Sequence, residues 1–288
     1  MNYFFIINPN SGSNKNKSII KNTLRKYPDL EKSFIYTEYP GHAARIAKQL
    51  IEKDVKNIVA VGGDGTVNEI ASEMINTDVN LGIVPMGSGN GFARSLNLPL
   101  NPRQALDGIF KMYSIKVDVG KVNQRYFFAV AGVGMDATIA YSFQSSKKRG
   151  AFSYFIVGAK EYFNYSYPEF NITSNNETIS VKPLIITVAN ANQFGNGALI
   201  APHADLQDGL LDICIVNRMS LFKTVQAANK MFKGQIRKLS SYSTFNSKGL
   251  EISSQNENIN YHVDGEPLKG TNKLVFTILP KALNVLVN

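Results

Sequence analysis

The sequence predicts two domains, an α/β domain with a parallel sheet followed by a largely antiparallel β-sandwich. In the first part, apolar runs alternate with helical patterns, and glycine-rich turns join the two kinds of segment. From about residue 116, short apolar strands are divided by Asn, Gly and Ser, which is typical of antiparallel sheets. We therefore place the α/β domain at residues 1–118 and the β-rich domain at residues 119–288.

The β-rich part also contains segments that do not look like strands. Helical patterns interrupt it near residues 150–164 and 220–235, and the polar run 173–177 reads as a hairpin turn. The single cysteine, Cys214, lies in an apolar strand-like run, so we expect it to be an inert core residue.

The composition limits the class of protein. A chain of 288 residues with 44% hydrophobic content has enough apolar material for a sizeable core. A net charge of +9 and a pI near 9.4 favour anionic partners such as nucleotides, phosphorylated substrates, nucleic acid or an anionic membrane. The sequence has no apolar run of about 18 residues and no basic signal-peptide start, so we expect a cytoplasmic protein.

The most informative segment is a glycine-rich turn between a strand and a helix. The apolar strand 57–61 ends at Gly62-Gly63-Asp64-Gly65, and a helix follows, with Thr66 as the expected N-cap and Glu69 completing a capping box. Bare N–H groups at a helix start bind anions, so the turn suits a phosphate group. Because a carboxylate there would repel a phosphate, Asp64 predicts an intervening Mg²⁺.

Two further loops support the same site. The strand 81–85 is followed by Met86-Gly87-Ser88-Gly89-Asn90-Gly91, and the strand 3–7 is followed by Asn8-Pro9-Asn10-Ser11-Gly12-Ser13. In a parallel α/β sheet such loops emerge at one carboxyl edge, where ligands bind. The sequence therefore predicts a phosphate-binding edge built from three loops.

With these motifs in place, the chain resembles the diacylglycerol kinase catalytic-domain family, which includes bacterial lipid kinases, sphingosine kinases and ceramide kinases. The matching stretches occur in family order over nearly the whole chain: 8–12, 61–70, 85–90, 201–212 and 264–267. The glycine loop alone is less specific, because NAD kinases and phosphofructokinases share a Gly-Gly-Asp-Gly core.

The resemblance implies an ATP- and Mg²⁺-dependent kinase that phosphorylates the hydroxyl of a membrane lipid, either diacylglycerol or a sphingosine-like long-chain base. The 1–118 domain would bind the nucleotide and the 119–288 domain the lipid. The resemblance adds Thr37, which by itself simply ends a strand. The expected nucleotide-binding residues are Asn8, Pro9, Asn10, Ser11, Gly12, Thr37, Gly62, Gly63, Asp64, Gly65, Thr66, Val67, Asn68 and Ser88.

A second acidic turn is a candidate metal site. The resemblance maps a structural Mg²⁺ onto Asp205, Asp208 and the carbonyl of Leu210, with Asp118 linking it to the active site. Hard cations take oxygen ligands of this kind. The alternative is an Asp-Gly hairpin turn with a solvated Asp. His203 is a weak metal candidate, because no Cys or second His stands at zinc-like spacing.

The candidate general base lies in the segment Asp264-Gly265-Glu266, which follows the strand 259–263. A carboxylate here could accept the proton of the acceptor alcohol. The sequence does not distinguish Asp264 from Glu266, and the alternative is again an ordinary Asp-Gly hairpin. We expect His262 to lie beside this loop without a role in proton transfer.

One departure concerns the acceptor. Many bacterial members of the family carry an Asp shortly after the stretch Gly87-Ser88-Gly89-Asn90, where this chain has Gly91. The Ser-Gly-Asn form resembles sphingosine-kinase-like members, so the identity of the lipid stays open.

Three rival functions remain. An NAD kinase-like enzyme with a soluble substrate would explain the glycine loop but not Asp264-Gly265-Glu266. A basic nucleic-acid-binding protein rests on charge alone. A catalytically inactive nucleotide sensor would not need the carboxylates. A P-loop enzyme is excluded by the absence of Gly-x-x-x-x-Gly-Lys-Ser/Thr.

A lipid acceptor implies reversible contact with a membrane, and we expect the protein at the inner membrane surface. The compact basic cluster Lys147-Lys148-Arg149 is flanked by Phe143, Phe152, Tyr154 and Phe155, which suits an anionic interface. The alternative is a solvated charged loop capping a helix whose aromatic side chains face the core.

Overall fold

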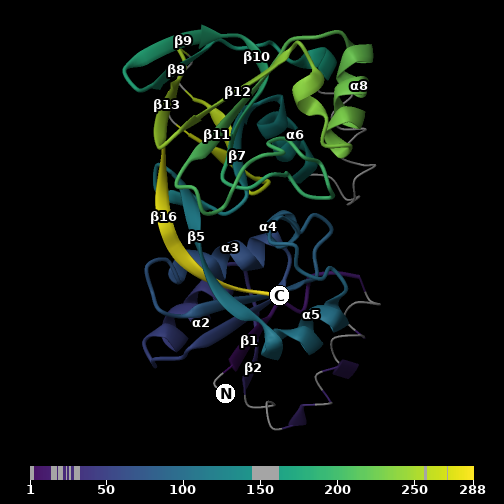
Figure 1. Cartoon of the computed structure of the whole chain (residues 1–288), viewed down its shortest axis with the longest axis vertical. Helices are drawn as coiled ribbons and strands as arrows, with labels where there is room; N and C mark the ends of the chain where they lie inside the picture. The colour runs from purple at the N-terminus through teal and green to yellow at the C-terminus, as the bar shows by residue number, and fades with distance from the viewer. Residues whose placement is uncertain are drawn as a thin grey trace. The chain divides into compact units, whose positions relative to one another are not determined.

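The computed structural model describes residues 3–13, 18, 22–23, 25, 27–28, 33–144, 162–255, 258–270 and 272–288, and it divides into two compact units (Figure 1). The first unit comprises Met1–Val117 and Lys281–Asn288, and the second comprises Asp118–Pro280. The chain leaves the first unit within strand β5 (Tyr113–Val122) and returns within strand β16 (Lys273–Val287). The sequence-based division assigns all of residues 119–288 to the second domain, whereas the structure groups Lys281–Asn288 with the first unit.

The first unit is built on a parallel sheet. Its described strands follow the order β2-β1-β3-β4, and the C-terminal part of β16 pairs parallel with β4 at Asn284 and Asn80. Ile7 of β1 is in register with Val61 of β3, so the ends of these strands meet at one edge. The bounds of these strands are β1 (Tyr3–Ile7), β2 (Phe34–Tyr36), β3 (Asn57–Gly62) and β4 (Asn80–Pro85).

Both faces of this sheet are buried, as expected for parallel strands. One face packs against α5 and η2 through a core that includes Phe5, Val59, Val84 and Leu106. Helices α2 and α3 pack on each other and on β1 and β3. The helical segments with described bounds in the first unit are α2 (His42–Ile51), α3 (Asp64–Glu73), α4 (Gly91–Ser95), α5 (Pro102–Gly108) and η2 (Ile109–Lys111).

The predicted capping box at the start of α3 is wrong. The helix begins at Asp64 rather than after Thr66, and its N-cap is Gly63, with no side-chain capping bond. Glu69 instead caps the neighbouring helix α2, because its carboxylate accepts hydrogen bonds from the backbone N–H groups of Gly41 (3.0 Å) and Ala43 (3.2 Å). A negative charge at a helix N-terminus is stabilising, so Glu69 ties α2 to α3.

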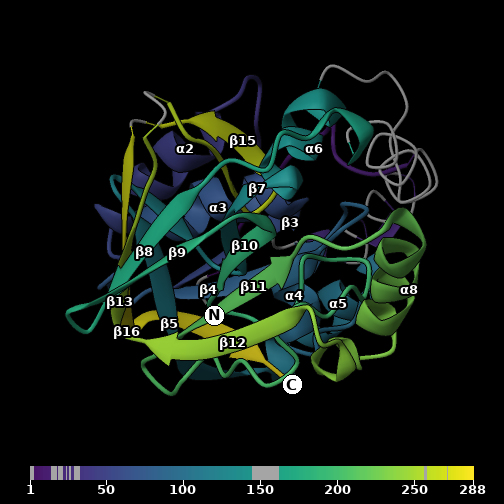
Figure 2. The same cartoon turned by 90° about the horizontal axis from the view of Figure 1, so that it is seen from above.

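In the second unit, the described strands of one antiparallel sheet follow the order β12-β11-β10-β7-β14-β15. Figure 2 shows β10, β11 and β12 running side by side, as their pairing requires. The strands are β7 (Val130–Gly134), β10 (Pro183–Ala189), β11 (Leu211–Asn217), β12 (Tyr242–Ser247), β14 (Asn260–Val263) and β15 (Glu266–Lys269).

A second layer of strands completes a sandwich. The portion of β16 before Lys281 pairs with β13 (Gly249–Ser253), which pairs in turn with β8 (Phe170–Ser174) and β9 (Glu177–Val181), while β6 (Arg125–Phe127) pairs with β5. Apolar side chains of both layers share one core, including Val133, Ile186 and Ile213 from one and Ile172 and Phe276 from the other. The predicted fold class is thereby confirmed.

Most local expectations for this unit are borne out. Asn175 and Asn176, both with positive φ, form the turn between β8 and β9. The helix expected near 220–235 is α8 (Leu221–Phe232), and Cys214 is buried, which raises its thiol pKa to about 11. Two further described helical segments are α6 (Met135–Gln144) and η3 (Ile236–Lys238). Most of the helix expected near 150–164 lies outside the described residues, as does Lys147-Lys148-Arg149.

Candidate functional site

Three loops follow β1, β3 and β4 at the carboxyl edge of the parallel sheet; in chain order, the first is 8–13, the second 62–65 and the third 86–91. Hydrogen bonds join the first loop to the second. The backbone N–H of Asn8 donates to the carbonyl of Val61 (3.0 Å), and the Asn8 side-chain amide donates to Thr66 Oγ1 (3.0 Å). The Ser11 hydroxyl oxygen accepts from the N–H of Gly63 (3.3 Å). Polar side chains of the first loop therefore fix the backbone of the glycine turn.

Asp64 joins the second loop to the third. Its Oδ2 accepts a hydrogen bond from the N–H of Asn90, and its Oδ1 accepts one from the N–H of Gly91, both at 2.8 Å. These donors stand at the start of α4, where a carboxylate is favoured. The sequence argument that Asp64 needs a cation is weakened, because backbone N–H groups already face its charge.

The glycines of these loops differ in the space that a Cβ atom would find. A Cβ on Gly87 would lie 2.9 Å from the Cα of Gly63, and one on Gly62 would lie 2.5 Å from the Cβ of Thr66. These glycines are required by the close approach of the protein to itself. A Cβ on Gly65 would meet no atom within 4 Å, so the described protein leaves that space open.

The other expected nucleotide-binding residues lie on the same three loops or beside them. Pro9, Asn10 and Gly12 belong to the first loop, and Ser88 is exposed on the third. Thr37 directly follows β2, and its N–H donates to the carbonyl of Ile7 (2.9 Å). Two residues of α3 differ in accessibility, since Val67 is buried in the core and Asn68 is half-buried.

In the second unit, the Asp264-Gly265 pair forms the tight turn between β14 and β15. Both residues have positive φ, 48° and 85°, as a two-residue hairpin of this kind requires. The Asp264 carboxylate folds back onto the segment before β7. It accepts hydrogen bonds from the backbone N–H groups of Phe128 (3.0 Å), Ala129 (2.9 Å) and Val130 (3.1 Å). Asp264 is therefore a strongly held carboxylate that fixes the turn.

Glu266 is held differently. It begins β15, its side chain is exposed, and among the described residues it accepts no hydrogen bond. The two carboxylates therefore differ in their surroundings, because Asp264 accepts three backbone hydrogen bonds and Glu266 accepts none from the described residues.

The acidic turn 205–210 is ordered by its own backbone. The N–H groups of Gln207 and Leu210 donate to Asp205 Oδ1 and Asp208 Oδ1, each at 2.9 Å. Asp118, which is fully buried, accepts from the N–H of Gly209 (2.6 Å), and its own N–H donates to the carbonyl of Leu206 (2.7 Å). Asp118 is therefore attached to the turn by both backbone and side chain.

The charges of this turn are poorly compensated. Burial is the largest cause that raises the pKa of Asp208, and the negative charges of Asp205 and Asp118 raise it further, against a lowering by the Leu210 N–H. A divalent cation would relieve this repulsion, so the residues fit Mg²⁺ chemically. Within the described residues, no group of three or more His, Cys, Asp or Glu side chains is arranged to hold a metal. A cation here would need carbonyl or water ligands as well.

None of the three histidines offers a metal site. His203 is exposed, and His42 begins α2, where its Nδ1 accepts from the N–H of Glu38 (3.1 Å). His262 is buried, with its Nε2 3.1 Å from Asp136 Oδ2. Sequence reasoning missed Asp136, because nothing in the sequence marks a carboxylate at the start of α6 as the partner of a histidine on β14.

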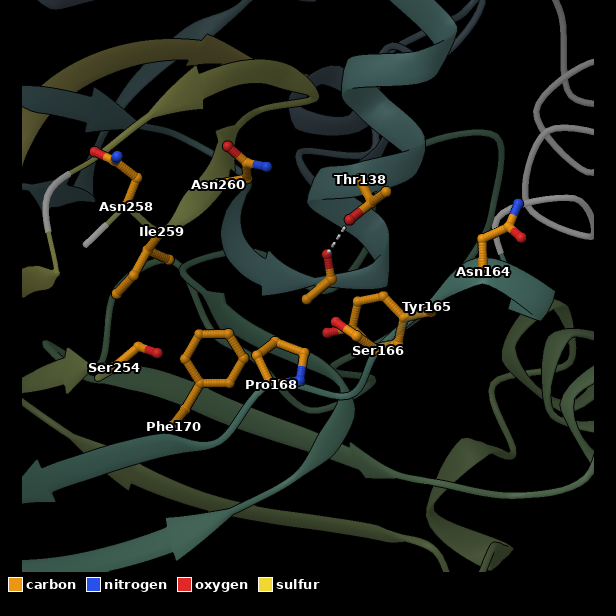
Figure 3. A pocket seen from close by; sticks show the side chains of 11 residues that line it. Thr138, Asn164, Tyr165, Ser166, Pro168, Phe170, Ser254, Asn258, Ile259 and Asn260 are labelled. Atoms are coloured by element: carbon orange, nitrogen blue, oxygen red, sulfur yellow. Dashed lines mark hydrogen bonds between the residues drawn. The ribbon is translucent and has the colours of Figure 1, made fainter. Parts of the chain in front are cut away.

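A cavity of about 240 Å³ in the second unit was also not expected from the sequence. Figure 3 shows its largely polar wall, in which Thr138 of α6 donates a hydrogen bond to the carbonyl of Gly134 (3.2 Å). Phe170 and Ile259 contribute apolar surface. None of the expected nucleotide, metal or base residues lines this cavity.

The comparisons with known proteins agree with this fold and with the kinase assignment. Residues 2–122 match the diacylglycerol kinase catalytic domain, and residues 129–287 match the YegS C-terminal NAD kinase beta sandwich-like domain. The chain therefore belongs to the diacylglycerol kinase catalytic-domain family, and it is a kinase.

Individual relatives cover most of the chain. A protein named diacylglycerol kinase from Staphylococcus haemolyticus is 31% identical over 267 residues, which are 91% of this chain and 81% of the relative. A protein named "Probable lipid kinase YegS-like" from Serratia proteamaculans is 32% identical over 250 residues, 84% of this chain and 80% of the relative. A crystal structure described as a diacylglycerol kinase from Bacillus anthracis has a TM-score of 0.73 at 21% identity, covering 99% of this chain and 96% of its own.

In the described part of the chain, no helix combines the length and the apolar character needed to span a bilayer.

Proposed function

We propose that this kinase transfers the γ-phosphoryl group of ATP, with Mg²⁺, to the hydroxyl of a membrane lipid, diacylglycerol or a sphingosine-like long-chain base. The observation that carries the proposal is the three-loop edge of the first unit, which Ser11 and Asp64 hold together while the space beside Gly65 stays open. The lipid acceptor is supported by the names of the relatives, which are a diacylglycerol kinase and a lipid kinase.

In this proposal the chain positions the nucleotide with backbone groups. The N–H groups at the start of α3, which has no side-chain capping bond, suit phosphate oxygens, and the described protein leaves the space beside Gly65 open. Asn8, Ser11 and Thr66 hold the backbone that presents those groups. Bound Mg²⁺ would neutralise phosphate charge as it does in other phosphoryl transfers, with Asp64 as the carboxylate through which the loop meets it.

A Gly65→Ala variant tests the proposed phosphate-binding site at the start of α3. Because the new Cβ has no described protein atom within 4 Å and alanine favours helices, we expect the free energy of unfolding to stay equal or rise by about 0.5–1 kcal/mol. The methyl group would occupy the ligand's space, so ATP affinity should fall at least about tenfold. Calorimetric titration with ATP and thermal melting measure the two quantities.

Gly62→Ala is the matched control for this test. Its Cβ would clash with Thr66 at 2.5 Å, so this variant should lose stability as well as affinity. Normal ATP binding by folded Gly65→Ala would contradict the placement of the nucleotide.

We further propose a structural Mg²⁺ at Asp205, Asp208 and the Leu210 carbonyl, with Asp118 ordering the turn. Outer-shell partners alone are worth about 10–100-fold in metal affinity, so loss of the Asp208 ligand should cost at least that much. We expect Asp208→Ala to melt at the same temperature with and without Mg²⁺, whereas wild type gains stability from the ion. The exposed Asp78→Ala is the control. An undiminished Mg²⁺-dependent gain in Asp208→Ala would place the ion elsewhere.

The proton acceptor in the proposal is Glu266, and Asp264 is a positioning residue that fixes the β14–β15 turn. The supporting observations are that the exposed Glu266 carboxylate accepts no hydrogen bond from the described residues, and that three backbone N–H groups donate to Asp264. In this proposal the protein is cytoplasmic and works at the inner surface of the membrane, because the acceptor lipids reside in the bilayer.

The acceptor is tested by incubating the enzyme with radiolabelled ATP and a panel of lipids in mixed micelles. Diacylglycerol and a long-chain base should be compared directly, because the Ser88-Gly89-Asn90-Gly91 sequence leaves the identity of the lipid open. NAD belongs in the same panel as the soluble rival substrate. Label in NADP with none in any lipid would favour the NAD kinase-like function instead.

A further inference from the structure

The segment between Asp212 and Glu251 of the second unit is strongly basic. It contains no Asp or Glu, and its basic residues are Arg218, Lys223, Lys230, Lys233, Arg237, Lys238 and Lys248. A large part of the protein's net charge of +9 is therefore concentrated in this stretch. Helix α8 and the 3-10 helix η3, which packs against it, lie within it.

Helix α8 also exposes apolar side chains that a surface helix would normally bury. Phe222 is 72% exposed, Val225 46% and Phe232 55%. Their spacing of three and seven residues places them on one face. The opposite face contacts the protein through Ala227, which is buried, and through the partly buried Met231. Both views show α8 at the periphery of its unit (Figures 1 and 2).

Basic residues stand beside this apolar stripe. Lys223 and Lys230 are seven residues apart on α8 and therefore share one side of the helix. Lys233 follows the end of α8, and Arg237 and Lys238 lie on η3. All but Lys230, which is half-buried, are exposed.

This combination of an apolar stripe and an adjoining basic row is the pattern of a helix that lies in a membrane interface. We propose that the outer face of α8, with Phe222, Val225, Phe232, Lys223 and Lys230, docks the protein onto an anionic lipid bilayer together with the adjoining Lys233. Charge complementarity favours anionic lipid over a neutral surface, and the aliphatic Val225 between the two Phe residues favours an apolar phase over nucleic acid.

The biological reason for membrane docking rests on the proposed lipid acceptor, but the test of docking is independent of that acceptor. Vesicle binding is measured without ATP, so a failure of docking leaves the kinase assignment intact. A failure to phosphorylate lipid likewise leaves the docking surface standing.

The first test is co-sedimentation with vesicles of phosphatidylglycerol and phosphatidylcholine, compared with phosphatidylcholine alone. Each basic residue near an anionic surface contributes about 1 kcal/mol to binding, so Lys223→Ala/Lys230→Ala should weaken vesicle binding roughly 30-fold. Added salt should also weaken vesicle binding by the wild type, because it screens this attraction. Phe222→Ser/Phe232→Ser should weaken it about 100-fold or more. The controls are Lys53→Ala/Lys56→Ala for charge and Ile179→Ser, an exposed apolar side chain on β9, for apolarity.

The second test uses the absence of tryptophan from this chain. Phe222→Trp introduces a single reporter on the docking face, and Tyr113→Trp introduces one at an exposed position on β5. Adding anionic vesicles should shift the emission of the first reporter to the blue, and brominated lipids should quench it. The second reporter should not respond.

Several results would overturn the docking proposal. The first is equal vesicle binding by the wild type and both α8 variants. The second is equal binding to vesicles with and without anionic lipid. The third is a Phe222→Trp reporter whose emission does not change when anionic vesicles are added. Loss of a dimer in the Phe222→Ser/Phe232→Ser variant, with vesicle binding unchanged, would assign the face to a second copy of the chain. Binding of the face to RNA but not to vesicles would assign it to nucleic acid.

Discussion

Glu266→Gln should lower the rate of phosphoryl transfer about 10²–10⁴-fold, which is the usual cost of removing a general base. The exposed side chain accepts no hydrogen bond from the described residues, so the amide should leave the fold and the melting temperature unchanged. ATP affinity should also be retained. Steady-state turnover with saturating ATP, alongside a thermal melt, measures the effect.

Asp264→Asn is the informative comparison, because it should reduce activity for a different reason. Asp264 Oδ2 accepts from the N–H of Phe128, and Oδ1 accepts from those of Ala129 and Val130. The Asn side chain has one acceptor oxygen, so at least one of these donors loses its partner. An unsatisfied buried donor costs about 1–3 kcal/mol, and this variant should therefore melt lower. Normal turnover by Glu266→Gln would exclude Glu266 as the base, and normal turnover by both would place it elsewhere.

The second large effect is expected for Asp64→Asn, which should reduce turnover on the order of 10²-fold or more. The Asn oxygen can replace only one of the two acceptors that hold the N–H groups of Asn90 and Gly91, so the loop after β4 loses one of its two hydrogen bonds to this side chain. Asp54→Asn is a matched control, because Asp54 is exposed in the same unit and has the positive φ that Asn tolerates.

The Mg²⁺ dependence of Asp64→Asn separates two roles of the carboxylate. If Asp64 acts on the ion, the variant should need a higher Mg²⁺ concentration for half-maximal rate. If it only positions α4, that concentration should match wild type while the maximal rate falls. Wild-type turnover at limiting Mg²⁺ would contradict both roles.

The fold class and the glycine loops could be predicted from the sequence because their signals are local. The alternation of apolar runs marks strands such as 57–61, and glycines at strand ends mark the turns. The turn at Asn175-Asn176 and the helix α8 were predictable for the same reason. These features depend on the conformational preferences of neighbouring residues.

The contacts that distinguish the candidate site residues were not predictable, because their partners lie far apart in the sequence. Asp264 and Phe128 are separated by 136 residues, and Asp64 and Asn90 by 26. Glu69 fits the sequence pattern of a capping box but caps another helix, because folding places the N-terminus of α2 within its reach. Exposure is equally invisible in a sequence, so α8 could be predicted as a helix but not as one with an exposed apolar face.

The central claim, transfer of phosphate from ATP to a lipid hydroxyl, is tested most directly by following the phosphate itself. The enzyme is incubated with ATP carrying ¹⁸O in its γ-phosphoryl group, Mg²⁺ and a micelle of diacylglycerol and long-chain base, and the organic phase is analysed by mass spectrometry. We expect a lipid phosphate that retains the labelled oxygens, formed only with Mg²⁺ and nearly abolished in Glu266→Gln. Labelled inorganic phosphate with no labelled lipid from either acceptor would contradict the claim.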